Sequence, residues 1–301
     1  MVKQRWDRWV WAGVFLWLFC FQPADACTLW GAVGASVQGG GALIAKNRDY
    51  APDHFQELAV LRPAQGFQSL VLMAVGGEEP GVKAGVNEKG LVIVSATANQ
   101  VPRAERDKAE QKKGLMRHLL STCASVDEVL KNIDLFRRAA FYLVADRKEV
   151  AVIEVAPAMR RSVIRRDSGT LSHTNHYCAI DSQDIRQKAG ASSTTRLGRI
   201  DELLKTHPQL YSIEDFFRFS SDQNAGPDNS VWRTGSDLTQ RRTLATWIVA
   251  VPPAGSPQLY LKTADPGEPE QICRLSIAEA FRLKGGDRIP LTAALCSGPV
   301  P

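Results

Sequence analysis

The stretch Ala24-Asp25-Ala26-Cys27 divides the chain into a short leader and a long globular part. A cut between Ala26 and Cys27 makes a cysteine the first residue, so that one carbon carries both a thiol and a free α-amine. A terminal amine titrates at about pH 8, and it can therefore take the thiol proton at neutral pH, directly or through one water. This stretch predicts a nucleophile that is created by processing.

The residues before the cut follow the pattern of a signal peptide. Basic residues within 1–8 precede an unbroken apolar run over 9–21, and a proline and small residues follow. This run is short for a membrane span, which takes about 20 residues, so a retained anchor is the less favoured alternative. We expect signal peptidase to remove residues 1–26, and residues 27–301 to form one periplasmic or secreted domain.

Attachment of lipid to Cys27 is a second alternative, because this cysteine directly follows the cleavage site. Lipoprotein signals usually have a larger aliphatic residue three positions before the cysteine and a small uncharged residue two positions before it. Here these positions hold Ala24 and Asp25, which disfavours lipidation. A non-catalytic lipoprotein acylated on Cys27 is therefore the alternative from outside the enzymes.

Composition excludes several classes of protein. Without the leader, 34 Lys and Arg stand against 30 Asp and Glu, a net charge of +4 with no basic run, so nothing indicates nucleic-acid binding. Four further cysteines, an even number, suit an oxidising compartment, although the pairing stays open and free buried thiols are the alternative: Cys123, Cys178, Cys273 and Cys296. None forms a C-x-x-C pair, so no zinc or dithiol site is expected.

Short apolar segments bounded by turn residues predict most of the secondary structure. Strands are expected over 28–35, 42–45, 58–61, 69–75, 83–86, 91–97, 141–145, 150–155, 162–164, 171–174, 244–251 and 259–262. Helices are expected over 115–122 and 194–205, and from the capping residues Ser125, Ser212 and Ser276. Two antiparallel sheets covered by helices, in an α+β fold, accommodate this order.

Four polar stretches draw attention as candidate chemistry. They are Cys27, Lys46-Asn47-Arg48-Asp49-Tyr50, Gly85-Val86-Asn87-Glu88-Lys89-Gly90-Leu91, and His173-Thr174-Asn175-His176-Tyr177 followed by Ser192-Ser193-Thr194-Thr195-Arg196. Each has an ordinary explanation when it is taken singly. An Asn-Arg-Asp cluster after a strand is most often a turn, and the two histidines lack a carboxylate at metal spacing, which favours a structural role.

The joint order of these stretches resembles the N-terminal nucleophile (Ntn) hydrolases. A mature N-terminal cysteine and a strand ending in [R/K]-N-x-D-[Y/W] are typical of choloylglycine hydrolase and penicillin V acylase relatives. The T-N-H-Y and S-S-x-x-R stretches look most like the acyl-coenzyme A:6-aminopenicillanate acyltransferase branch. The resemblance extends from Cys27 to about Arg196 and is weaker beyond. It implies a four-layer αββα sandwich of two antiparallel sheets flanked by helices.

The resemblance also implies roles for individual residues. Cys27 matches the nucleophile and its amine the base, and Asp49 matches the carboxylate that orients the nucleophile. Asn175 matches the oxyanion-hole asparagine, a donor typically worth about 3 kcal/mol in the transition state. Arg196 matches the arginine that completes the charge network of the site.

Two roles stay open. Lys46 stands where relatives usually have arginine, and lysine offers a point charge and not a planar fork. Either Lys46 or Arg48 is therefore the candidate cation opposite Asp49. The second oxyanion donor is expected just after the strand that follows the G-x-N-E-K-G-L turn, where Asn99 is the candidate.

The implied enzyme is an exported amidase or acyltransferase that cleaves linear, non-peptide N-acyl amides through a thioester on Cys27. A cysteine dipeptidase of the same superfamily, which also begins with C-T and has an [R/K]-N-x-D element, is the second enzyme interpretation. The T-N-H-Y and S-S-x-x-R stretches argue against it. The sequence contains no G-x-S-x-G, H-E-x-x-H or dinucleotide-binding glycine pattern, so the expected partner is a small-molecule substrate, with no cofactor or metal.

Overall fold

A computed structural model describes the fold of the chain outside the leader. The described residues are 26–77, 79–109, 114–181, 185, 189–207, 210–283 and 288–289. The predicted signal peptide covers residues 1–26, of which only Ala26 belongs to the described part. None of the described helices combines the length and the apolarity that crossing a bilayer requires.

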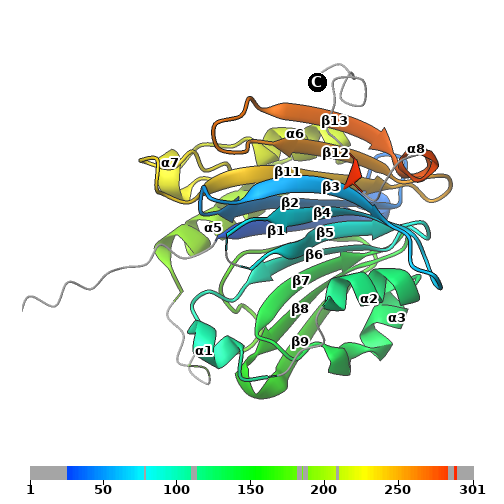
Figure 1. The fold of residues 1–301 in the computed structure, drawn as a ribbon, viewed down its shortest axis with the longest axis horizontal. Helices are drawn as coiled ribbons and strands as arrows, with labels where there is room; N and C mark the ends of the chain where they lie inside the picture. The colour runs from blue at the N-terminus through cyan, green and yellow to red at the C-terminus, as the bar shows by residue number, and fades with distance from the viewer. Residues whose placement is uncertain are drawn as a thin grey trace, which may run out of the picture.

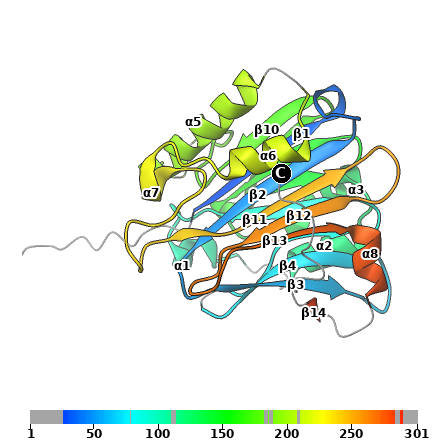
Figure 2. The same ribbon diagram turned by 90° about the horizontal axis from the view of Figure 1, so that it is seen from above.

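Two antiparallel sheets form the centre of the molecule (Figures 1 and 2). Within the described residues, the first sheet has six strands in the spatial order β10-β1-β2-β11-β12-β13, namely β10 Gly169–His173, β1 Cys27–Val33, β2 Ala42–Tyr50, β11 Arg242–Val251, β12 Gln258–Thr263 and β13 Gln271–Ser276. The second, over the same part of the chain, has eight strands in the order β14-β3-β4-β5-β6-β7-β8-β9, namely β14 Arg288–Ile289, β3 Phe55–Leu61, β4 Ser69–Val75, β5 Gly81–Asn87, β6 Val92–Thr97, β7 Ala140–Ala145, β8 Val150–Ala156 and β9 Arg160–Arg166.

Helices cover the outer faces of both sheets (Figure 2). The helices of the described residues are α1 Arg103–Arg106, α2 Leu115–Thr122, α3 Val126–Lys131, α5 Ala191–Thr206, α6 Ile213–Ser220, α7 Gly226–Asn229 and α8 Ile277–Arg282, with short 3-10 turns at Gly34–Ser36, Ile133–Leu135 and Pro157–Met159. The helix α8 contacts one strand of each sheet and adds Ile277 and Ala280 to the core between the sheets. The helices α5 and α6 pack on the first sheet, and α2 and α3 pack on the second. The predicted αββα sandwich is therefore confirmed.

Three apolar clusters hold these layers together, as the alternation of side chains along strands requires. Between the sheets, Leu29 and Ile44 of the first meet Val94 and Leu143 of the second. On the opposite face of β1 and β2, side chains such as Trp30 pack under α5 and α6. A third cluster joins the outer face of the second sheet to α2 and α3. Residues with even and odd numbers on one strand therefore serve different layers.

The turn after β5 shows why a Gly-x-Asn-Glu-Lys-Gly-Leu segment is structural. Asn87 Oδ1 accepts the backbone N–H groups of Lys89 and Leu91, both at 3.0 Å, which closes the hairpin. Its Nδ2 donates to the carbonyl oxygens of Leu120 and Cys123, both at 2.8 Å, which fixes the end of α2. This asparagine joins a hairpin to a helix and lies apart from the site described below.

Strand β2 is longer than its apolar run predicts. The expected strand ends at Ala45, whereas β2 continues through Tyr50, so the turn that the Asn-Arg-Asp cluster suggests when taken singly is wrong. Both neighbours, β1 and β11, pair with this polar half of the strand. The polar run is thus a central strand whose side chains find partners on both faces.

The cysteines divide into different states. Cys27, Cys123 and Cys178 are free, and Cys273 is disulfide-bonded. Cys296, which belongs to the set of four with open pairing, lies outside the described residues.

Candidate active site

The two central strands place Cys27 beside a cavity between the sheets. Cys27 opens β1 and lies opposite Arg48 of β2, while Leu29 lies opposite Lys46. The side chains of Cys27, Lys46 and Arg48 therefore share the face that turns toward the second sheet. Cys27 is 7% exposed and lines the cavity.

The backbone of Cys27 is held by two of the predicted site residues. Its nitrogen donates to Asn175 Oδ1 at 2.7 Å, and its carbonyl oxygen accepts from Arg196 Nη1 at 2.7 Å. Arg196 Nη1 also donates to Thr28 Oγ1 at 2.8 Å, and Nη2 donates to Asn175 Oδ1 at 3.1 Å. Ala26 precedes Cys27 in this structure, so this nitrogen is a peptide amide. The predicted Cys27, Asn175 and Arg196 are thus brought together.

The loop that carries Asn175 is attached to the start of α5 by Ser193. The Asn175 backbone N–H donates to Ser193 Oγ at 2.9 Å, and the Thr174 hydroxyl donates to the Ser193 carbonyl at 3.0 Å. One helical turn later, Arg196 reaches Cys27. The Ser-Ser-x-x-Arg spacing therefore places a loop anchor and the guanidinium on one side of a single helix.

Asp49 lies on the other face of β2, on the side of the helices. Its Oδ1 accepts from the Thr243 hydroxyl at 2.8 Å, and its Oδ2 lies 3.7 Å from Arg233 Nη1. Burial raises the pKa of Asp49, and the guanidinium groups of Arg233 and Arg196 oppose that rise. Asp49 thus interacts with Arg196, the side chain that binds the Cys27 carbonyl.

The cation that pairs with Asp49 differs from the predicted one. The sequence predicts Lys46 or Arg48 opposite Asp49, whereas the ion pair in the structure is with Arg233. Because β2 remains a strand through Tyr50, the side chains of Lys46 and Arg48 point toward the second sheet and that of Asp49 points toward the helices. No motif marks Arg233, which lies after α7, far from Asp49 along the chain.

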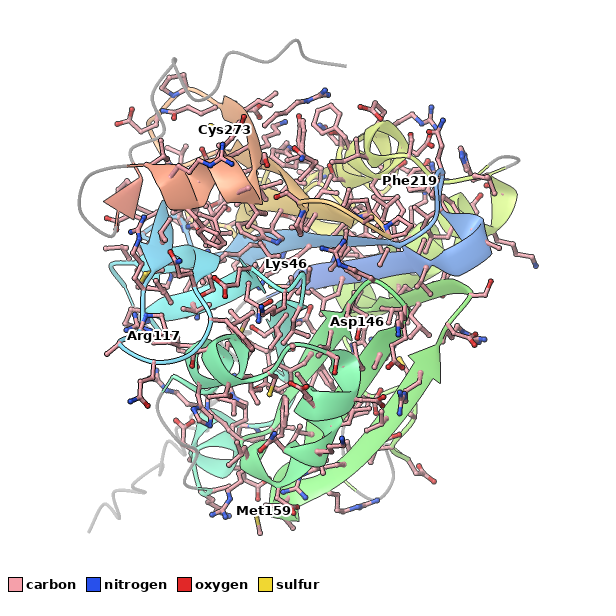
Figure 3. The ribbon with its side chains drawn as sticks, turned by 90° about the vertical axis from the view of Figure 1, so that its right-hand side faces the viewer. Lys46, Arg117, Asp146, Met159, Phe219 and Cys273 are labelled. Carbon is pink, nitrogen blue, oxygen red and sulfur yellow. The ribbon has the colours of Figure 1, made fainter. Side chains whose placement is uncertain are left out.

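Lys46, labelled in Figure 3, instead links the two sheets. Its ammonium donates to the carbonyl oxygens of Lys83 at 2.9 Å and Ser95 at 2.6 Å. Burial lowers the pKa of Lys46 to about 8, and the charge of a Cys27 thiolate is the strongest influence in the opposite direction. Lys46 and Cys27 therefore influence each other electrostatically on the face of the first sheet that turns toward the second.

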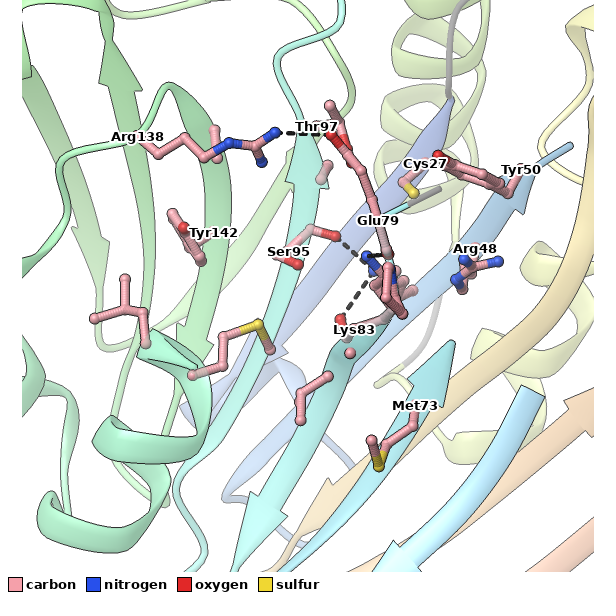
Figure 4. Close-up of a pocket in the computed structure, with 18 of the residues that line it drawn as sticks. Cys27, Arg48, Tyr50, Met73, Glu79, Lys83, Ser95, Thr97, Arg138 and Tyr142 are labelled. Carbon is pink, nitrogen blue, oxygen red and sulfur yellow. Dashed lines mark hydrogen bonds and ion pairs between the residues drawn. The ribbon is translucent and has the colours of Figure 1, made fainter. Parts of the chain in front are cut away.

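The cavity has a volume of about 770 Å³ and extends from Cys27 across the second sheet. Figure 4 shows the Cys27 thiol beside Arg48 and Tyr50, together with the ion pair between Glu79 and Arg138, whose atoms are 2.7 Å apart. Two further lining residues, Leu115 and Tyr142, come from α2 and β7. None of the four wall residues Glu79, Arg138, Leu115 and Tyr142 belongs to a predicted motif.

Asn99 does not take the expected place. The described lining includes Thr97 but not Asn99, so the second oxyanion donor predicted at Asn99 is not supported by the geometry. The strand β6 ends at Thr97, whose carbonyl accepts from Asn175 Nδ2 at 2.9 Å. The sequence does not fix the position of this donor, because no charged residue or glycine marks the end of β6.

Solved structures share this arrangement of layers. Two variants of the conjugated bile acid hydrolase from Clostridium perfringens match with a TM-score of 0.56 at 14% identity, and 84% and 83% of this chain and 93% of each of those chains are covered. The Caenorhabditis elegans ortholog of N-acylethanolamine-hydrolyzing acid amidase matches with a TM-score of 0.51 at 14% identity, over 76% of this chain and 94% of that chain. The fold is therefore that of the Ntn hydrolases.

A family model narrows this class. The model described as acyl-coenzyme A:6-aminopenicillanic acid acyl-transferase matches residues 36–266, and the chain belongs to this family. No curated protein matches the chain. Family and fold together define an amide hydrolase or acyltransferase of the Ntn superfamily.

Proposed function

We propose that this protein is an exported amidase, with possible acyl transfer, that uses Cys27 as its N-terminal nucleophile after signal peptidase removes residues 1–26. The observation that carries the proposal is the fixation of the Cys27 nitrogen by Asn175 at 2.7 Å, beside a cavity of about 770 Å³. A backbone nitrogen needs no such side-chain acceptor to complete a strand. It does need one if, as a free amine, it is to stay aligned with its own thiol.

The reaction follows from these positions. The Cys27 amine takes the thiol proton, and the thiolate forms a C–S bond with the substrate carbonyl carbon. The second amide hydrogen of Asn175, beyond the one donated to Thr97, is the donor that we assign to the oxyanion. Collapse breaks the C–N bond as the ammonium of Cys27 returns the proton to the leaving nitrogen. Water or an acceptor amine then attacks the thioester, gives a proton to the Cys27 amine, and releases the thiol.

The wall of the cavity indicates the substrate class. Its described lining has five cationic residues, namely Lys46, Arg48, Lys83, Arg117 and Arg138, against the carboxylate of Glu79. Asp49 also borders the cavity, but its carboxylate faces Thr243 and Arg233 on the other side of β2. An apolar strip lies beside them, namely Met73, Val82, Leu115, Met116 and Ala140. We therefore propose an N-acyl amide with an apolar acyl chain and an anionic group, such as an N-acyl amino acid.

The mature first residue decides the mechanism. Intact-mass analysis of the exported protein is expected to show a free Cys27, and Cys27→Ala is expected to abolish amide cleavage. Cys27→Ser should be processed but poorly active, because a serine hydroxyl is a much weaker acid than a thiol. A diacylglyceryl mass on Cys27 would refute the enzyme, since acylation consumes both the nucleophile and the base. Near-full activity of Cys27→Ser would refute thiolate attack.

A substrate panel decides the class. N-acyl amino acids are expected to show a kcat/KM about tenfold above that of N-acyl amines without a carboxylate, the difference of about one charge-assisted hydrogen bond. Dipeptides are the third arm. Turnover of dipeptides alone identifies a cysteine dipeptidase and refutes the N-acyl amide proposal. Equal rates for charged and uncharged N-acyl substrates refute the assignment to the cationic wall.

A further inference from the structure

The loop that carries Asn175 has a second attachment, opposite Ser193, on the other sheet. Glu154 lies in the middle of β8, is 1% exposed, and shares the face of Val152 and Ala156, which turns toward the first sheet. Its carboxylate accepts the backbone N–H groups of three successive loop residues, which are Cys178 at 2.7 Å, Ala179 at 3.1 Å and Ile180 at 2.9 Å.

The charge of Glu154 is matched by His173, the last residue of β10. His173 Nε2 donates to Glu154 Oε1 at 2.9 Å, and Nδ1 donates to the Thr174 carbonyl at 2.9 Å. The Thr174 carbonyl can only accept, and the Glu154 carboxylate is ionised because it accepts from the loop N–H groups. Both ring nitrogens of His173 therefore donate, which makes the ring an imidazolium. Burial lowers the pKa of His173, but its interactions with Cys178 and Glu154 raise it to about 9.

This ion pair brackets the catalytic loop. His173 lies two residues before Asn175, and the three N–H groups begin three residues after it. A carboxylate in the interface between the sheets thus fixes both ends of the 173–180 segment, in which Asn175 holds the Cys27 nitrogen. Burying the two charges costs desolvation free energy, which five hydrogen bonds at Glu154 and His173 offset. Because these bonds are directional, they align the loop more rigidly than apolar packing does.

We propose that Glu154 and His173 are positioning residues for the reaction, which act by clamping the 173–180 segment so that Asn175 keeps its alignment with the Cys27 nitrogen. This inference rests on the proposed function for its kinetic consequence. Its structural part, the clamp itself, does not depend on which substrate is cleaved. Neither residue touches the cavity within its described lining, so substrate binding is not their role.

Asp146 offers a matched control. This carboxylate is 7% exposed and also accepts three backbone N–H groups, those of Val126 at 2.8 Å, Lys148 at 2.8 Å and Glu149 at 3.1 Å. These bonds fix the start of α3 and the turn after β7, and none of the three partners belongs to the loop that carries Asn175. Asp146→Asn therefore removes the same kind of buried charge from a place where the reaction should not respond.

The test compares Glu154→Gln, His173→Gln and Asp146→Asn. Glu154→Gln keeps the shape of the side chain but replaces one accepting oxygen by an NH₂ group. His173→Gln keeps a hydrogen-bond donor but removes the positive charge. Both clamp variants are expected to lower kcat about 10- to 100-fold with KM unchanged within about twofold, because a shift of about 1 Å in a catalytic group has effects of this size. Asp146→Asn should change kcat by less than about twofold at a similar loss of thermal stability.

A double-mutant cycle separates positioning from general destabilisation. If Glu154 acts through Asn175, then Glu154→Gln added to Asn175→Ala should lower kcat no further, while the losses of thermal stability should add. If the double variant loses kcat by the product of the two single losses, the proposal is overturned. A kcat of Glu154→Gln within about twofold of that of Asp146→Asn also overturns it.

Hydrogen exchange tests the clamp without any substrate. In Glu154→Gln and His173→Gln the amides of 178–180 should exchange about tenfold or more faster than in the wild-type protein, with the start of α3 unchanged, and the reverse is expected for Asp146→Asn. Unchanged protection at 178–180 overturns the clamp. A wild-type protein that cleaves no amide refutes the proposed function instead, and the two failures are thereby distinguished.

Discussion

Replacement of Lys46 by methionine is expected to remove a pH dependence from the free energy of unfolding. Lys46 is 2% exposed, and burial lowers its pKa from 10.5 to about 8. Between these two pKa values the unfolded chain binds more protons than the native state, so native stability rises with pH across this window. The buried charge of Lys46 therefore disfavours the native state by about 3 kcal/mol at pH 7, and by only about 1 kcal/mol at about pH 9.5.

The assay is urea unfolding of the wild-type protein and of Lys46→Met at several pH values between about 7 and 9.5. Loss of the bonds to the Lys83 and Ser95 carbonyls shifts the variant by an amount that is the same at each pH, because a neutral amine also donates. The wild-type protein should therefore gain about 2 kcal/mol relative to the variant over this range. Lys46→Arg, which stays charged, should show no such gain. A difference between wild type and Lys46→Met that stays constant within about 0.5 kcal/mol refutes the reasoning.

Two other changes test the charge network. Arg196→Lys should lower kcat by about 100-fold or more with little change in folding, because a lysine cannot bridge the Cys27 carbonyl and Asn175 Oδ1 in the way that the guanidinium does. Steady-state kinetics measures this change. A loss of kcat below about threefold contradicts the prediction. Arg233→Met should lower the free energy of unfolding by about 3 kcal/mol, because it leaves the Asp49 carboxylate buried without its ion pair. Adding Asp49→Asn should restore at least about 1 kcal/mol in urea titrations, and a double variant less stable than Arg233→Met argues against the pairing.

The elements of the fold are readable from the sequence because each is encoded locally. Ser212 and Asp215 form the capping box that begins α6, and Ser276 and Glu279 form the one that begins α8. The apolar segments that predict strands are the ones whose alternate side chains fill two clusters at once. The sequence does not predict the polar half of β2, because distant partners stabilise it, such as the Ser220 and Val231 carbonyls that accept from Asn47. No local pattern announces such partners.

The site divides in the same way. The grouping of Cys27, Asn175 and Arg196 could be predicted because each belongs to a short motif. In the Ser-Ser-x-x-Arg motif, for example, one helical turn separates the serine that anchors the loop from the guanidinium. Arg233 and Glu154 could not be predicted, because each contributes one side chain from a stretch that has no special spacing. Their roles arise only when the sheets pack and a buried charge needs a partner.

If residues 1–26 are removed as we propose, the contacts around Cys27 require no rearrangement of the site. The side chains of Asn175 and Arg196 already hold the nitrogen and the carbonyl oxygen of Cys27, each at 2.7 Å, while Ala26 is attached. A peptide nitrogen shares its lone pair with the preceding carbonyl and cannot accept a proton from the thiol. Once the Ala26 peptide is cut, the same nitrogen carries a localised lone pair, and the existing contacts to Asn175 and Arg196 are the ones that orient it. The strand register, the α5 contacts and the clamp on the Asn175 loop can therefore form during folding, and cleavage needs to change the chemistry of only one atom.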